Sequence, residues 1–154
     1  MATVFGKAVA GAQAGLNIAV RSWDSDVRHE YLFRGFVRHG KLTALTQFNQ
    51  FCFFASLLPI KESLQRRLVA FWESEVSPKC GNTASYVMDL AAHKDRIVLV
   101  NLHQYVKETS ASLFDWEADQ EVLEHGPFEF RLREAPMDGA AQFVEIILAE
   151  TQFE

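Results

Sequence analysis

Three polar residues on two neighbouring predicted strands have types and spacing that could support chemistry. Asp89 lies in the apolar segment 86–90, and Asn101 and His103 lie two residues apart at the end of the next apolar segment. Because side chains two apart on a strand point to the same face, Asn101 and His103 would face Asp89 across a hairpin. A carboxylate opposite such groups can hold a hard cation. The alternative is a polar patch whose members satisfy one another, and spacing alone favours this alternative.

The sequence contains none of the common catalytic or ligand-binding motifs. Gly6 and Gly11 have the spacing of a phosphate-binding P-loop, but Ala12 and Gln13 follow where that motif needs Lys and Ser or Thr. There is no G-x-S-x-G and no H-E-x-x-H segment. The five histidines show no zinc-ligand spacing. We therefore expect no bound metal and no catalytic residue of a standard class.

The elements that would position these residues are mainly strands. Strands are expected at residues 16–23, 31–37, 41–47, 85–91, 96–102, 128–132 and 143–149. Turns at His39-Gly40 and at residues 93–95 would close two hairpins, from 31–37 with 41–47 and from 85–91 with 96–102. Residues 113–117 predict a short helix or turn.

One principal helix is predicted to begin at Pro59. Apolar residues recur every three or four positions from Ile60 to Val76, and proline suits the first turn, where its missing N–H would be unpaired anyway. Pro78 and Gly81 are predicted to end the helix. Together the elements predict an α+β fold, in which a mostly antiparallel sheet carries one principal packed helix.

The composition is that of one globular domain with an excess of phenylalanine. The chain has 154 residues, 13 Phe, 23% charged residues and a net charge of -5. Since it is acidic and has no dense basic cluster, we expect no nucleic-acid binding. Two cysteines cannot form a disulfide framework, and Cys52, within the apolar run 51–54, is expected to be a core thiol. A reducing intracellular compartment follows, either the cytoplasm or the mitochondrion.

Two segments raise the question of membranes and partners. Residues 42–60 form an uncharged run of about transmembrane length, but their amides and hydroxyls would be costly in lipid, so no transmembrane segment is expected. Residues 1–15 are rich in Ala and Gly, and the spacing of Gly11 and Gly15 would let a helix approach a neighbour closely. We expect this segment to be an arm docked on a partner, the alternative being a flexible tail. Residues 16–154 would form a single domain.

Several short segments occur in the order and spacing of a known family. They are 20–23 (Val-Arg-Ser-Trp), 33–37 (Phe-Arg-Gly-Phe-Val), 40–42, 45–47, 86–89, 96–103 and 113–117. Over about residues 17–117 the chain resembles the C-terminal half of the cell division cycle protein 123 family. The resemblance implies the C-terminal lobe of an ATP-grasp fold. For function it implies an assembly chaperone of eukaryotic translation initiation factor 2.

The same resemblance implies a nucleotide site on the predicted sheet. The family has a strand motif of the form E-F-R-x-F-V, whose Arg faces phosphate. Arg34 matches this position, whereas Leu32 replaces the Glu. The aspartate that the family carries on the strand before the second hairpin turn matches Asp89.

Other positions depart from the family pattern. The Asp and Asn of the D-F-N-P motif, which hold a metal in the family, fall on Asn101 and His103. Of the Q-R-D motif only Gln47 is kept, because Phe48 and Asn49 replace the Arg and Asp. Losing a carboxylate at position 101 and gaining an imidazole at 103 disfavours magnesium. No cofactor is expected, with ATP and Mg²⁺ as the alternative.

These departures favour a pseudo-enzyme that serves as a structural or interaction subunit of a larger protein assembly. Respiratory and ATP synthase complexes of the mitochondrion are the hosts considered. Half of a two-lobed fold exposes a face that other subunits would cover, and the residues expected at such interfaces are Gly11, Gly15, Leu32, Phe36 and Phe48. Two alternatives stay open. One is an assembly chaperone that binds the gamma subunit of translation initiation factor 2, and the other is a residual ATP- and Mg²⁺-binding protein.

Overall fold

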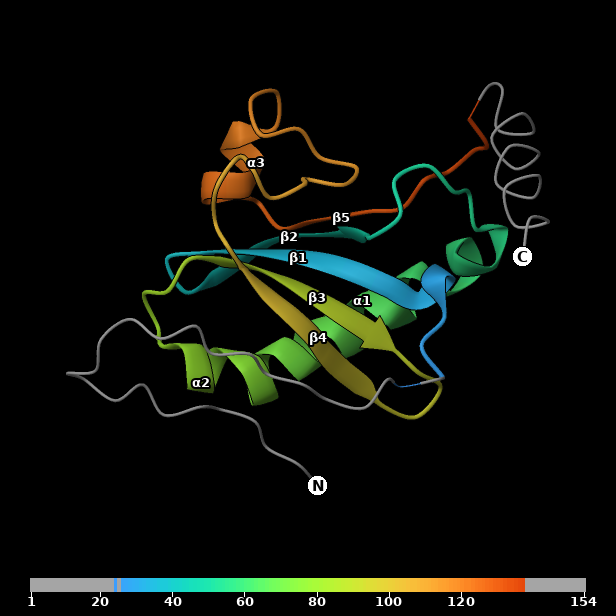
Figure 1. The fold of residues 1–154 in the computed structure, drawn as a ribbon, viewed down its shortest axis with the longest axis horizontal. Coiled ribbons are helices and arrows are strands. Elements are labelled where there is room, and N and C mark those ends of the chain that lie inside the picture. Colours follow the sequence, from blue (N-terminus) through green and yellow to red (C-terminus); the bar gives the residue numbers. More distant parts are fainter. Residues whose placement is uncertain (1–23, 25, 138–154) are drawn as a thin grey trace, which may run out of the picture.

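The computed structural model of the protein describes residue 24 and residues 26–137 (Figure 1). Its five strands form one sheet in the order β4-β3-β1-β2-β5. The strands are β1 (Leu32–Arg38), β2 (Lys41–Gln47), β3 (Tyr86–Ala92), β4 (Ile97–Gln104) and β5 (Glu129–Arg131). The helices are α1 (Lys61–Phe71), α2 (Ser77–Cys80) and α3 (Gln120–His125). The predicted α+β fold with one principal helix is confirmed, whereas the arm at 1–15 and the strands at 16–23 and 143–149 lie outside the described residues.

Both predicted hairpins are present. β1 pairs antiparallel with β2, and β3 pairs antiparallel with β4. The first turn needs positive φ at both central residues, and His39 has φ +49° and Gly40 φ +75°. A Cβ atom at Gly40 would lie only 1.8 Å from the backbone oxygen of Asn82, so the close approach also requires glycine.

β5 is the exception to the antiparallel pattern. It runs parallel to β2, with Leu45 opposite Phe130. The alternating residues of this segment predict a strand, but the direction of its pairing depends on how the chain returns to the sheet through α3. The sheet is therefore mostly antiparallel, with one parallel pair at its edge.

The principal helix is longer and less regular than predicted. Pro59 lies in the 3-10 turn Ala55–Ile60 that leads into α1, and a π-helical stretch, Trp72–Val76, joins α1 to α2. The prediction that Pro78 ends the helix is wrong, because the chain stays helical to Cys80. The π-helical stretch shifts the hydrogen-bond register, so Pro78 falls in the first turn of α2, where an N–H is not needed. Gly81 ends the helix with φ +87°.

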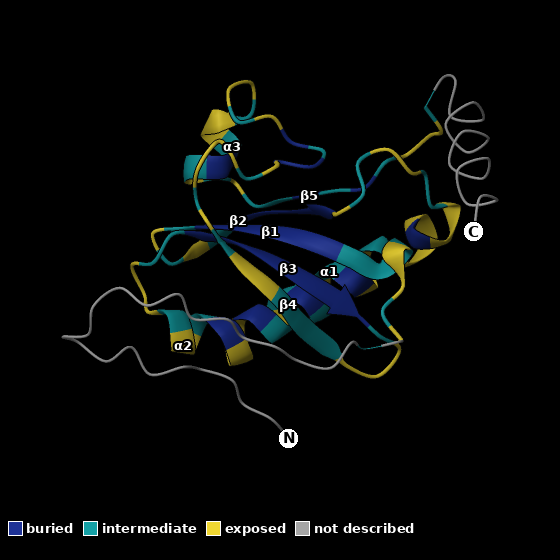
Figure 2. Ribbon diagram, viewed as in Figure 1, coloured by how far each residue is buried: buried dark blue, intermediate teal, exposed yellow. Residues whose placement is uncertain are grey.

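The larger core lies between the sheet and the principal helix (Figure 2). From the helical side it receives Leu64, Leu68, Trp72 and Val76, which recur every four residues and are buried. From the sheet it receives Phe33, Val37, Leu45, Tyr86, Met88, Leu90 and Phe130. Trp72 Nε1 donates to the Tyr86 hydroxyl at 3.0 Å, so the polar atoms of these two buried aromatic side chains are paired.

A smaller core lies on the opposite face, beneath α3 and the loop 105–119. Phe36 is fully buried there, and its ring centroid is 5.8 Å from that of Phe114 and 5.6 Å from that of Trp116. The prediction that Phe36 faces a partner is therefore wrong, because the chain's own loop covers it. Residues 113–117 form turns, one of the two predicted alternatives. The six residues of α3 are too few to show a helical period, and the sequence pattern does not reveal this helix.

The apolar run after β2 leaves the core. Cys52 is exposed, and 64% of Phe51 is exposed, so the predicted core thiol is wrong. The Asn49 side-chain oxygen accepts from the backbone N–H groups of Phe51 and Cys52. These hydrogen bonds form a turn directly after β2, so residues 51–54 do not extend the strand. None of the helices in residues 24 and 26–137 combines the length and the hydrophobicity of a transmembrane span.

Candidate functional site

A buried ion pair joins the two central strands. The register places Arg34 of β1 opposite Asp89 of β3. Arg34 Nε donates to Asp89 Oδ1 at 2.8 Å, and Arg34 Nη2 donates to Asp89 Oδ2 at 3.0 Å. Both residues are buried, with 5% and 6% of their surface exposed. The two parallel hydrogen bonds form the bidentate geometry that makes Arg–carboxylate pairs strong and directional.

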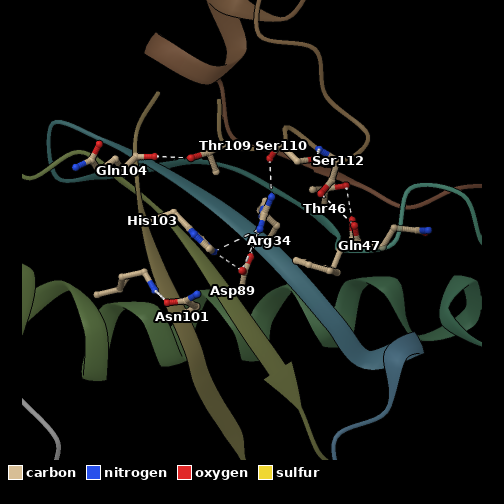
Figure 3. A network of polar contacts seen from close by, with 12 residues as sticks. Arg34, Thr46, Gln47, Asp89, Asn101, His103, Gln104, Thr109, Ser110 and Ser112 are labelled. Atoms are coloured by element: carbon tan, nitrogen blue, oxygen red, sulfur yellow. Dashed lines mark hydrogen bonds and ion pairs between the residues drawn. The ribbon is translucent and has the colours of Figure 1, made fainter. Parts of the chain in front are cut away.

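Two further groups complete this Arg34–Asp89–His103 network (Figure 3). His103 Nε2, from β4, lies 2.6 Å from Asp89 Oδ2. Arg34 Nη1 donates to the backbone carbonyl of Ser110, in the loop 105–119, at 2.7 Å. The network thus links β1, β3, β4 and the loop that covers this face of the sheet. The part played by Ser110 comes from its backbone, so its residue type carries no signal in the sequence.

The bonds within this network leave little for an external ligand. Both oxygens of Asp89 accept from Arg34, and all three guanidinium nitrogens of Arg34 have protein acceptors. Magnesium needs carboxylate oxygens that can coordinate it, and a phosphate needs guanidinium N–H groups that can donate to it. Nowhere in residues 24 and 26–137 do three or more His, Cys, Asp or Glu side chains gather as metal ligands. In this structure the residues at the phosphate and metal positions implied by the family resemblance are bonded to one another and to a backbone carbonyl.

Asn101 lies near the network without joining it. It is opposite Asp89 in the β3–β4 register, beside an irregularity in the pairing between Asp89 and Leu90. Its side-chain oxygen accepts from the backbone N–H of Leu102 at 2.9 Å, and the residue is exposed. Of the two β4 residues expected to face Asp89, only His103 touches it.

Gln47 holds a loop instead of contacting the network. Its Nε2 donates to the carbonyl of Cys52 at 2.7 Å and also to that of Asn49, and its Oε1 accepts from the backbone N–H of Arg133 at 2.8 Å. The side chain is buried and fully used by these contacts. Its role in the structure is to fix the chain where β2 ends.

Phe48 covers the outer side of the network. Its ring centroid lies 4.8 Å from the Arg34 guanidinium carbon, and 39% of the residue is exposed. Leu32, at the start of β1, is half-buried. Of the interface residues predicted from the sequence, these two have accessible surface, whereas Gly11 and Gly15 lie outside the described residues.

A second ion pair positions the loop that supplies Ser110. Arg131 of β5 donates to both carboxylate oxygens of Asp119, at 2.7 and 2.8 Å, and its guanidinium carbon lies 4.0 Å from the Phe114 ring centroid. The hydrogen bonds from Arg131 lower the pKa of Asp119 below its ordinary value. The loop is therefore attached to the sheet at two points, near its middle by Arg34 and at its end by Arg131.

Comparison with known proteins places the chain among proteins of the same fold. The sequence model of the D123 family matches residues 7–149. C-terminally truncated Cdc123 from Schizosaccharomyces pombe is similar with a TM-score of 0.60 and 21% identity, over 71% of this chain and 42% of that chain. Cdc123 from the same organism is similar with a TM-score of 0.60 and 22% identity, over 71% and 43%. This chain thus covers less than half the length of either structure. No curated protein matches it.

Proposed function

Because the chain belongs to the D123 family, which is the family of Cdc123, we propose that it acts as a protein-binding assembly factor. The family consists of chaperone-type assembly factors and is not established as a family of catalytic enzymes. The partner that we propose is the gamma subunit of translation initiation factor 2, which the family resemblance implies. Family membership favours this alternative over a subunit of a mitochondrial complex, for which no comparison offers support.

We further propose that binding does not require a nucleotide, so that the chain is a pseudo-enzyme. The Arg34–Asp89–His103 network is the observation that carries this proposal. To hold a phosphate with the N–H groups that now bind Asp89, Arg34 would have to break this ion pair. The Asp89 carboxylate would then be buried without its partner, which is destabilising. Asn101 supplies no charge to replace the missing carboxylate.

Phe48 supports a protein-binding role for the same face. A large apolar ring with 39% of its surface exposed is costly to leave in water, and aromatic rings are enriched at the centres of protein interfaces. It lies beside the network, at a position where the family motif carries Arg.

The direct test measures binding between the full chain and the gamma subunit by calorimetry, with and without ATP and Mg²⁺. We expect the same affinity in both conditions. Phe48→Ser should weaken binding by about tenfold, the loss expected for an aromatic hot spot. Phe51→Ser, on the same loop, removes a ring that is 64% exposed and makes no contact with Arg34, so a smaller loss there would show that the effect belongs to the ring beside the network and not to exposed aromatic surface in general. Absence of binding would reject this partner, and binding that appears only with ATP would reject independence from nucleotide.

A second titration, of the chain with ATP and Mg²⁺ or Mn²⁺ alone, tests the remaining alternative. We expect no heat of binding at millimolar nucleotide. A saturable heat that disappears in Asp89→Asn would instead establish residual nucleotide binding at this site.

A further inference from the structure

A cavity of about 720 Å³ opens at the other end of the sheet from the covering loop. Its walls come from three places, namely the segment before β1, the first turns of α1 and the turn between β3 and β4, which lie close together in Figure 1. No residue of the Arg34–Asp89–His103 network lines it. Its volume falls within the range of small-molecule sites in proteins. We call it the turn cavity.

The floor of the turn cavity is apolar. Tyr31, Ile60 and Leu64 contribute to it, and Ile60 keeps 38% of its surface exposed. The exposed surface of Ile60 and the Tyr31 ring, which both line the cavity, offer apolar surface on which a flat apolar group could be buried. Burying such a group would remove this apolar surface from water.

The cationic groups of the wall differ in how far they are neutralised. Arg28 pairs with Glu30 at 2.9 Å, and Arg96 pairs with Asp24 at 2.9 Å, so the protein compensates both charges itself. Arg67 donates through Nη2 to the backbone carbonyl of His93, and no carboxylate of the described residues pairs with it. Lys94 follows His93 in the turn and likewise has no ion pair within the described ranges. Arg67 and Lys94 thus both line the turn cavity, and neither is paired with a carboxylate of the described residues.

His93 adds a polar group that its surroundings do not satisfy. Its side chain is 9% exposed, and its Nε2 atom makes no hydrogen bond to any described residue, although Asp24 Oδ2 lies 3.5 Å away. Buried polar nitrogens are nearly always hydrogen-bonded in folded proteins, so an unsatisfied one calls for an explanation. The residue His93 lines the cavity together with Arg67 and Lys94.

We propose that the turn cavity binds a small aryl phosphate, with the phosphate between Arg67 and Lys94 and the ring on Tyr31, Ile60 and Leu64. A guanidinium donates to phosphate oxygens in a fork, and an ammonium adds a flexible point charge. Asp26 and Asp95 also line the cavity, and Asp26 lies 3.9 Å from Arg96, so Asp95 is the carboxylate that would repel ligands of high negative charge and favour a single phosphate over a chain of them. This site is separate from the proposed partner interface and does not depend on it.

The test uses phenyl phosphate as the probe and the full chain, with binding followed by ligand-observed NMR and calorimetry. Wild type should bind saturably, whereas inorganic phosphate should bind more weakly and phenol should not bind saturably. Arg67→Gln should weaken binding about tenfold or more, the loss expected for charge-assisted hydrogen bonds. Lys94→Gln should weaken it several-fold.

Arg66→Gln is the matched control, because Arg66 is the preceding residue of α1, is exposed and does not line the cavity. Its affinity should equal that of wild type. Circular dichroism of each variant separates loss of binding from loss of fold, and Lys94→Gln changes only an exposed turn. No saturable binding at millimolar probe, or equal losses in Arg66→Gln and Arg67→Gln, would overturn the proposal while leaving the gamma-subunit test unaffected.

Discussion

On the α1 face of the sheet, apolar side chains from the principal helix and the sheet pack against one another, and Trp72 donates a hydrogen bond to the Tyr86 hydroxyl. On the opposite face, a smaller apolar cluster under the loop 105–119 gives way to the Arg34–Asp89–His103 network. The first face depends on many contacts of similar size. The second depends on a few contacts that must all be present, because a buried charge without its partner is destabilising.

This difference predicts how each face responds to substitution. Removing part of a buried apolar side chain lowers the free energy of unfolding, because buried apolar area is lost and a cavity is left. The loss grows with the number of atoms removed. Removing one member of a buried ion pair leaves its partner unpaired, whereas removing both can cost little. Substitutions on the two faces should therefore differ in additivity as well as in size.

The largest effect is expected on the network. Asp89→Leu should lower the free energy of unfolding by about 3–5 kcal/mol, because the Arg34 guanidinium stays buried without its carboxylate. The double variant Arg34→Met with Asp89→Leu should recover most of that loss. Urea unfolding of wild type, both single variants and the double variant gives the coupling energy. Additive losses in the double variant would show that the pair itself contributes nothing distinctive.

On the α1 face, Leu68→Ala should lower the free energy of unfolding by about 2–5 kcal/mol. Leu68 is fully buried between α1 and the sheet. Ser63→Ala, on the exposed side of the same helix, is the control and should change stability by less than about 0.5 kcal/mol. Urea unfolding is again the measurement, and equal effects of the two substitutions would contradict the packing of this helix face.

The ionisation of Tyr86 and Tyr105, one tyrosine near each face, measures how far the two phenols are buried. Burial is the main cause that raises the pKa of Tyr86 and of Tyr105 to about 12 from 10.0. In the unfolded chain each phenol ionises near 10, while the folded protein still holds the proton. Stability should therefore be unaffected below pH 10 and should fall as pH rises from 10 to 12.

Absorbance titration of phenolate in wild type, Tyr86→Phe and Tyr105→Phe measures this directly. Each variant should lack one phenol that ionises near pH 12. If ionisation of all phenols were complete near pH 10 in the folded protein, the burial of these rings would be wrong.

The smallest effect is expected at Cys52, which belongs to neither face. Because its side chain is exposed, Cys52→Ser should change the free energy of unfolding by less than about 0.5 kcal/mol. In the native protein Cys52 should react with an aromatic disulfide reagent before the half-buried Cys80. A loss of about 2 kcal/mol or more would place this thiol in the core instead.

The sequence by itself determined the elements of the α1 face. The hairpin turns and the four-residue recurrence of apolar side chains from Leu64 to Val76 report local geometry and the burial of one helix face. These signals are local because backbone period and hydrophobic burial act within a single element. The order and spacing of the segments shared with the family predict how these elements are arranged in the fold.

Only the tertiary structure decided the opposite face. Phe36 was expected at an interface exposed by half of a two-lobed fold, but the loop 105–119 of the same chain covers it. Arg34 and Asp89 are 55 positions apart, and their pairing follows from strand order, not from residue type. The apolar neighbours of Cys52 predict a core position for it, yet the turn at Asn49 directs the chain away from the sheet and leaves Cys52 exposed. In each case a contact between distant segments overrode the local pattern, because burial and charge pairing depend on which residues meet in space.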